Sequence, residues 1–209
     1  MLKKWQTISL LVSSTLLTGC LQPIKTPKQH LYALNPSNAT KHSKPAATKA
    51  HQKHNQHFRD QTLLVMPTQA ASSLQTDQIA YSVQPYHIDY YQHNRWIAPP
   101  AEQLNNLIIQ RLNQAQIFQS VVSTPFTGDT DLRLDTRLLQ LRQVFNHDKS
   151  KSHVKLVLAA QLSNAHTGKV IKARQFSVSL PAAPNPRGGV VAVNKGIDKI
   201  LSQLITLIG

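Results

Sequence analysis

The stretch HVKLVLAAQLS, residues 153–163, places an apolar side chain at every second position, namely Val154, Leu156, Leu158, Ala160 and Leu162. Successive side chains of a β-strand point to opposite faces of the sheet, so this spacing predicts a strand with one buried face. The next segment, NAHTGK, contains Gly168 and predicts a turn. The segment VIKARQFSVSL, residues 170–180, then predicts a return strand, and the two strands form a long hairpin.

A third long strand is predicted just before this hairpin, in DLRLDTRLLQLRQVF, residues 131–145. Its leucines keep one alternating phase up to Leu138 and the opposite phase from Leu139 onward. Because one extra residue in a strand reverses the phase of every later side chain, a β-bulge is expected at Leu138-Leu139.

Two amphipathic helices are predicted on either side of the long strands. The first follows Pro99-Pro100, which suits a helix start, and Glu102 in its first turn complements the helix dipole. Its apolar stripe consists of Leu104, Leu107, Ile108, Leu112 and Ala115. The second runs over residues 190–208, with the stripe Val193, Ile197, Ile200, Leu201, Leu204 and Ile208.

Shorter strands are predicted in TLLVMP (62–67), QIAYSV (78–83) and YHIDYY (86–91), with a turn at Pro85. The segment HLYAL (30–34) is expected to fold back as an additional strand. The predicted fold class is therefore α+β: a mainly antiparallel β-sheet with two amphipathic helices packed on one face, preceded by a signal peptide and a tether.

The N-terminus has the layout of a secretory signal peptide over residues 1–19. Lys3 and Lys4 precede a short apolar stretch, which is too short and too rich in Ser and Thr for a transmembrane helix. It ends in LLTGC, which resembles the bacterial lipobox and contains the only cysteine of the chain, Cys20. We expect cleavage before Cys20 and its acylation, including a palmitate-type chain, which gives a durable membrane anchor. The alternative is an ordinary signal peptide followed by an accidental, buried cysteine.

The position after the anchor favours the outer membrane. Leu21 stands where an aspartate commonly causes retention in the inner membrane, so we expect a lipid-anchored protein on the periplasmic face of the outer membrane.

The chain has 23 Lys+Arg and 9 Asp+Glu residues, a formal charge of +14. In an exported protein this charge points to anionic lipid, cell-surface polymer or an acidic protein rather than to nucleic acid.

The segment after the first strand, residues 38–60, has no aliphatic side chain larger than alanine and is predicted to be a disordered linker. Its residues His51, His54 and His57 would share one face of a helix and could bind zinc or copper weakly, but no metal site is predicted. The expected domains are residues 1–19 as signal peptide, residues 20–60 as acylated N-terminus, first strand (about 30–34) and linker, and residues 61–209 as the folded domain.

No pattern in the chain predicts an enzyme or a cofactor. The nine acidic residues do not pair, and neither a nucleophile elbow nor a glycine-rich phosphate loop is present. Arg187-Gly188-Gly189 is interpreted as a flexible loop before the last helix, or else as an anion site at its amino end.

Arg95-Trp96 is a candidate partner-docking pair, because Arg and Trp often dominate interface energies. A structural tryptophan packed in the core is the alternative.

Four segments taken together resemble the ABC-type transport auxiliary lipoproteins, the PqiC-like family. They are the lipobox, LYAL (31–34), RWIAPPAEQLNNLIIQRL (95–112) and TGKVIKARQF (167–176). The resemblance covers residues 31–34 and most of 62–207, and the His-rich linker departs from it as an insertion.

The resemblance implies a non-enzymatic accessory of a lipid transport system that spans the periplasm. Its implied partners are an ABC permease complex and an MCE-type substrate-binding protein, a tunnel-forming lipid carrier that the lipoprotein would dock at the outer membrane. A homo-oligomer is possible. The competing hypothesis is an independent periplasmic lipoprotein that binds lipid or glycan in a groove between helix and sheet, and a periplasmic hydrolase is the least favoured.

Overall fold

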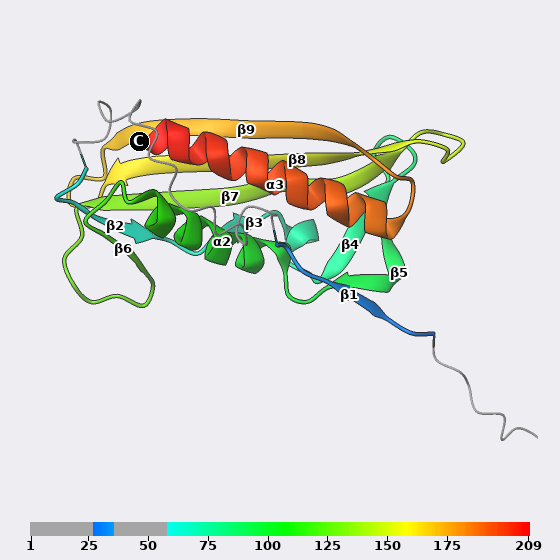
Figure 1. Ribbon diagram of the computed structural model, residues 1–209, viewed down its shortest axis with the longest axis horizontal. Helices are drawn as coiled ribbons and strands as arrows, with labels where there is room; N and C mark the ends of the chain where they lie inside the picture. The colour runs from blue at the N-terminus through cyan, green and yellow to red at the C-terminus, as the bar shows by residue number, and fades with distance from the viewer. Residues whose placement is uncertain (1–26, 36–57) are drawn as a thin grey trace, which may run out of the picture.

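The computed structural model describes residues 27–35 and 58–209. Cys20, the signal peptide and the linker histidines His51, His54 and His57 lie outside these ranges. In chain order the elements are β1 (His30–Tyr32), β2 (Thr62–Val65), β3 (Gln69–Ala70), a 3₁₀-helix (Ser72–Leu74), β4 (Gln78–Ser82), β5 (Asp89–Trp96), α2 (Pro100–Ala115), β6 (Ser120–Ser123), β7 (Leu132–Phe145), β8 (Ser152–Asn164), β9 (Val170–Ala182) and α3 (Pro186–Ile208). The described strands join in one sheet (Figure 1).

The three long strands form the antiparallel hairpins that the sequence predicts. β7 pairs with β8, and β8 pairs with β9, almost along their whole lengths. The register of β7 on β8 shifts between Leu138 and Gln140, and Leu139 is 37% exposed. The bulge predicted at Leu138-Leu139 is therefore confirmed. Gly168 occupies a left-handed position (φ 70°) in the β8–β9 turn, a conformation that glycine adopts without a steric penalty.

The shorter strands correct the prediction of a mainly antiparallel sheet. β2, β3 and β4 all run parallel to β7, β6 runs parallel to β2, and β1 runs parallel to β5. Among these short strands, only β4 and β5 form an antiparallel pair. Parallel neighbours need a long crossover connection, and the segment between β2 and β6, which includes α2, supplies one. The sheet is thus mixed, although the α+β class is confirmed.

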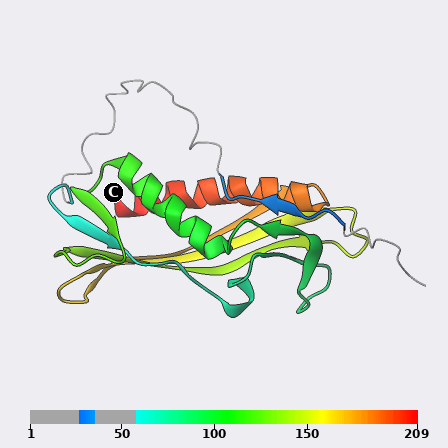
Figure 2. The ribbon, with the colours of Figure 1, turned by 90° about the horizontal axis from the view of Figure 1, so that it is seen from below.

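Both helices cover the same face of the sheet, as predicted (Figure 2). The residues that face the sheet from α2 include Leu104, Ile108 and Leu112, which are all buried. Every residue of the stripe predicted for α3 is also buried. An ion pair between Arg111 and Asp198 connects the two helices. α3 begins at Pro186 instead of residue 190, because the side chain of Asn185 accepts a hydrogen bond from the Gly188 backbone N–H (2.8 Å) and caps the first turn.

The interface between α3 and the sheet is closely packed around Trp96. The void lined by Ile79, Trp96, Leu141, Val190 and Val193, among others, has a volume of only about 10 Å³. A volume of this size is at the lower limit for a single water molecule. This void therefore has no room for a lipid chain, and it does not support the hypothesis of a lipid held between helix and sheet.

A buried glutamine joins several elements where α3 begins. Gln143 is 2% exposed, and its side-chain amide donates to the Ser152 hydroxyl (2.7 Å) and to the carbonyl of Ala183 (3.0 Å). The hydroxyl of Tyr91 donates to Gln143 Oε1 (2.9 Å). Burial, with a further contribution from Tyr81, raises the pKa of Tyr91, which keeps the phenol protonated as a donor. The carbonyl oxygen of Gln143 also lies against Gly189, where an added Cβ would be 2.2 Å away.

Gly189→Ala should therefore lower the free energy of unfolding by about 1–3 kcal/mol, the usual cost of overpacking a well-packed site. Gly196→Ala is the matched control in the same helix, because its Cβ would meet Leu156 at an ordinary contact distance of 3.4 Å. Because alanine favours the helix over glycine by up to ~1 kcal/mol, Gly196→Ala should keep or slightly raise the free energy of unfolding. Urea denaturation of the two variants checks the difference. Equal stability of the two variants would contradict the role given to Gln143.

Candidate docking surface

The structure separates the two residues of the predicted docking pair. Trp96 is 2% exposed and belongs to the hydrophobic core. Arg95 remains at the surface with 30% of its side chain exposed, and its guanidinium donates to Asp77 Oδ1 (2.9 Å). The packed tryptophan that the sequence left open as the alternative is what the structure contains. A docking role therefore stays a prediction, and Arg95 is the residue of the pair that can contact a partner directly.

Strand alternation explains this separation. Successive residues of β5 point to opposite faces, so Trp96 turns toward α3, and Arg95 turns toward the face that no helix covers. Leu31 of β1 lies in register with Arg95 and is 62% exposed. An arginine and an exposed leucine thus stand side by side on neighbouring strands.

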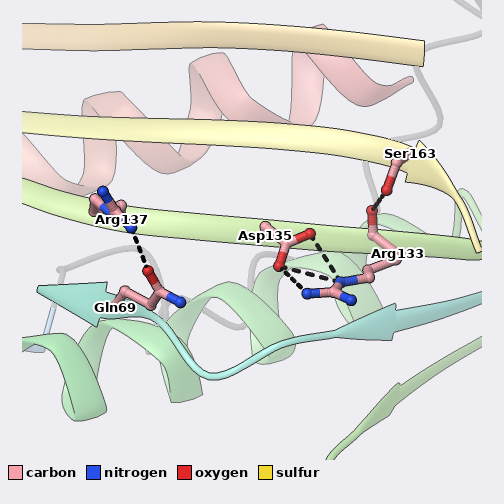
Figure 3. Close-up of polar contacts among 5 residues, drawn as sticks. All are labelled: Gln69, Arg133, Asp135, Arg137 and Ser163. Atoms are coloured by element: carbon pink, nitrogen blue, oxygen red, sulfur yellow. Dashed lines mark hydrogen bonds and ion pairs between the residues drawn. The ribbon is translucent and has the colours of Figure 1, made fainter. Parts of the chain in front are cut away.

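A second polar cluster on the helix-free face comes from β7 and β3 (Figure 3). Arg133, Asp135 and Arg137 occupy alternate positions of β7, so their side chains leave the same face of the sheet. Gln69 of β3 reaches Arg137 from the neighbouring strand. We call Gln69, Arg133, Asp135 and Arg137 the β7 cluster. The alternation of Arg133, Asp135 and Arg137 is visible in the sequence, but the contribution of Gln69 depends on the pairing of β3 with β7.

The two arginines of the β7 cluster differ in how their charge is balanced. Arg133 makes a two-point contact with Asp135, through Nε to Oδ2 (2.9 Å) and Nη2 to Oδ1 (2.8 Å). This hydrogen bonding, aided by the negative charge of Asp135, raises the pKa of Arg133. Arg137 instead donates to the neutral amide oxygen of Gln69 (2.6 Å). That hydrogen bond orients the guanidinium without compensating its charge, so Arg137 can still attract an anionic group.

Two shallow hollows meet at Arg137, Gln69 and Leu139. One of about 740 Å³ lies over β7, β8 and β9, and small residues such as Ala159 and Ala173 form part of its lining. The other, of about 620 Å³, lies between β3 and the start of α2. Within residues 27–35 and 58–209, no three His, Cys, Asp or Glu residues gather closely enough to hold a metal ion.

No helix in the described part of the chain combines the length and apolar character needed to cross a membrane.

The fold is thus an α+β domain, a mixed sheet with two helices on one face and polar side chains on the other. The family model for the ABC-type transport auxiliary lipoprotein component matches residues 42–205. The chain therefore belongs to this family, which confirms the resemblance noted in its sequence. The family is one of auxiliary transport lipoproteins and not a known enzyme family.

Two solved structures share the fold over most of the chain. A Xanthomonas campestris protein has 17% sequence identity and a TM-score of 0.68, covering 86% of this chain and 95% of its own. A second protein, described only as uncharacterized, has 16% identity and a TM-score of 0.64, covering 88% of this chain and 100% of its own. Identities this low establish the fold alone. None of the curated proteins is similar enough to match the chain.

Proposed function

We propose that the protein is a lipid-anchored accessory of an intermembrane lipid transport system. In this proposal the acylated Cys20 holds the domain on the periplasmic face of the outer membrane. The domain there docks an MCE-type carrier that works with an ABC permease complex. It performs no chemistry of its own, and its part is to hold the carrier beside the membrane.

Family membership is the single observation that carries this proposal. The lipobox before Cys20 supports the anchor, and Leu21 supports the outer membrane. The close packing of α3 against β4, β5 and β7 favours a docking role over storage of a lipid there. The signal peptide (residues 1–19), the N-terminal segment (20–60) and the folded domain (61–209) keep their expected bounds in this proposal.

The helix-free face is the proposed docking surface. Arg95 lies on this face, and the β7 cluster adds Arg137, whose charge is not balanced by its hydrogen bond to Gln69. Arginines that are oriented and still accessible are typical anchors of protein interfaces. An acidic or carbonyl-rich surface on the carrier would satisfy both side chains.

Docking through this face predicts that the double variant Arg95→Ala/Arg137→Glu loses the carrier and keeps its fold. Both side chains are partly exposed, and exposed ion pairs contribute only about 0–1 kcal/mol to stability. Co-purification of the carrier from detergent-solubilised membranes should fall at least tenfold, since two interface anchors are removed, each worth roughly 2 kcal/mol.

Lys199→Glu is the matched control, because Lys199 is exposed on α3, on the helix-covered side of the domain. This variant should co-purify the carrier as the wild type does. Full recovery of the carrier with the double variant would exclude the helix-free face. Equal loss with Lys199→Glu would show that overall charge, and not this face, governs the interaction.

A further inference from the structure

Three connections lie together at one end of the domain. β4 and β7 run parallel with Ser82 in register with Val144, so the β4–β5 turn lies near the β7–β8 turn. Ser152 of β8 pairs with Ala182 of β9, which places the connection from β9 to α3 at the same end. Figure 1 shows these three connections at the right of the molecule. We call this the hairpin end, and it comprises residues 27–30, 83–89, 146–155 and 183–195.

The N-terminal segment also leads to the hairpin end. β1 runs parallel to β5, with His30 opposite Asn94, so the residues before His30 continue toward the start of β5. That start adjoins the β4–β5 turn. Cys20 precedes His30 by ten residues, a length that spans at most ~36 Å when fully extended. A lipid on Cys20 therefore holds the hairpin end near the bilayer.

Charge is distributed unevenly along the long axis. The hairpin end carries six cations, Lys28, Lys149, Lys151, Lys155, Arg187 and Lys195, against two acids, Asp89 and Asp148, a net charge of +4. The opposite end (residues 58–61, 123–131, 164–172 and 206–209) carries three cations, Arg59, Lys169 and Lys172, against three acids, Asp60, Asp129 and Asp131, a net charge of zero. α3 adds to this polarity, because its positive N-terminus lies at the hairpin end.

The acids of the hairpin end are already engaged within their own turns. Asp89 lies 3.1 Å from the imidazole of His87. Asp148 accepts hydrogen bonds from the backbone N–H and the hydroxyl of Ser150 (3.0 and 2.7 Å). The exposed cations Lys149, Lys151 and Arg187 outnumber these two acids, so the outward surface of this end is net positive.

The β4–β5 turn presents an aromatic ring to solvent. Tyr86 is fully exposed, and its backbone is left-handed (φ 65°), a conformation that bulky residues rarely adopt. Ile88 beside it is 39% exposed. The sequence predicts a strand from residue 86, but β5 begins only at Asp89, so these side chains belong to the turn. Tyrosine is enriched where proteins meet the headgroup region of a bilayer.

We propose that the hairpin end rests on the anionic surface of the bilayer to which Cys20 is anchored, with Tyr86 and Ile88 in the headgroup region and Lys149, Lys151 and Arg187 against lipid phosphates. The orientation rests on the proposed acylation of Cys20. Each basic residue near an anionic membrane surface strengthens binding about fivefold, and the effect decreases with salt. The contact fixes which way the tethered domain faces and leaves the opposite end directed away from the bilayer.

The test places a tryptophan reporter at each end of the acylated full-length protein in vesicles of phosphatidylethanolamine and phosphatidylglycerol with brominated chains. Tyr86→Trp reports the hairpin end, and Phe126→Trp reports the opposite end, where Phe126 is 43% exposed. Trp96 is common to both variants and buried, so it serves as the shared background. We expect quenching and a blue shift for Tyr86→Trp, and neither for Phe126→Trp.

The second part of the experiment reverses the charge of the basic residues at each end. Adding Lys149→Glu, Lys151→Glu and Arg187→Glu to the Tyr86→Trp variant should abolish most of the quenching, while Lys169→Glu, at the opposite end, should leave it unchanged. Replacing phosphatidylglycerol by phosphatidylcholine should act like the triple reversal. Absence of quenching at Tyr86→Trp in vesicle-bound protein, or equal quenching at both ends, would overturn the orientation.

Failure of the anchor can be distinguished from failure of the contact. Mass spectrometry of the purified protein shows whether Cys20 is acylated. If it is not, the proposed anchor is wrong, and the same reporters are read after coupling Cys20, the only thiol in the chain, to a maleimide lipid. Quenching at Tyr86→Trp would then support the membrane contact by itself, and its absence would reject it.

Discussion

Cys20→Ser is expected to leave the protein as an unprocessed precursor or to release it from the membrane. The acyl chains on Cys20 supply the anchor in the proposed function, and each buried methylene contributes about 0.8 kcal/mol to membrane binding. A serine hydroxyl does not receive the lipid, so nearly all of the membrane-bound protein should be lost. Fractionation of cells and mass spectrometry of the protein measure the two effects, and globomycin should cause the wild-type precursor to accumulate.

Leu21→Asp is the control for the Cys20 experiment. It leaves the thiol in place and should therefore retain acylation and membrane association. Because an aspartate after the cysteine commonly causes retention, the variant should move to the inner membrane. Mature size and membrane association that persist in Cys20→Ser would show that the protein is not a lipoprotein anchored at this residue.

Trp96→Ala should lower the free energy of unfolding by ~3–5 kcal/mol, the usual cost of removing a large buried aromatic side chain. Trp96 is buried in the core against α3, and the void beside it is only about 10 Å³, so the indole is closely packed. The indole therefore contributes packing, and its loss leaves a cavity. Chemical denaturation of the domain measures the change.

Tyr86→Ala is the matched control for Trp96→Ala, since Tyr86 is an aromatic residue of the same β4–β5 unit and is fully exposed. Its removal should change stability by less than ~0.5 kcal/mol, as is usual for surface substitutions. If both variants unfold with the stability of the wild type, Trp96 does not pack as the structure indicates.

The long elements could be predicted from the sequence because their patterns are local. The alternation in β7, including its reversal at Leu138-Leu139, reports burial directly, and the same holds for the stripes of α2 and α3. β3 and β6 cannot be predicted in this way, because two and four residues are too few to show a period. The parallel order of the short strands is a property of the whole chain, and no periodicity encodes which strands become neighbours.

The candidate docking surface is likewise predictable only in part from the sequence. The sequence identifies Arg95 and Trp96 as neighbours, but only the position of α3 decides which of them is buried. The β7 cluster depends on Gln69, which lies 68 residues from Arg137 and meets it through the pairing of β3 with β7. The alternation of Tyr86 and Ile88 predicts a strand, but turns can show the same alternation, and β5 begins only at Asp89.

In the proposed function, this lipoprotein holds a carrier of a lipid transport system at the membrane. The most direct test of this function is to purify the acylated full-length protein from membranes after mild cross-linking and to identify every protein and lipid that accompanies it. We expect to recover an MCE-type substrate-binding protein together with the components of an ABC permease. Recovery of a tightly bound lipid or glycan without either protein would contradict this function.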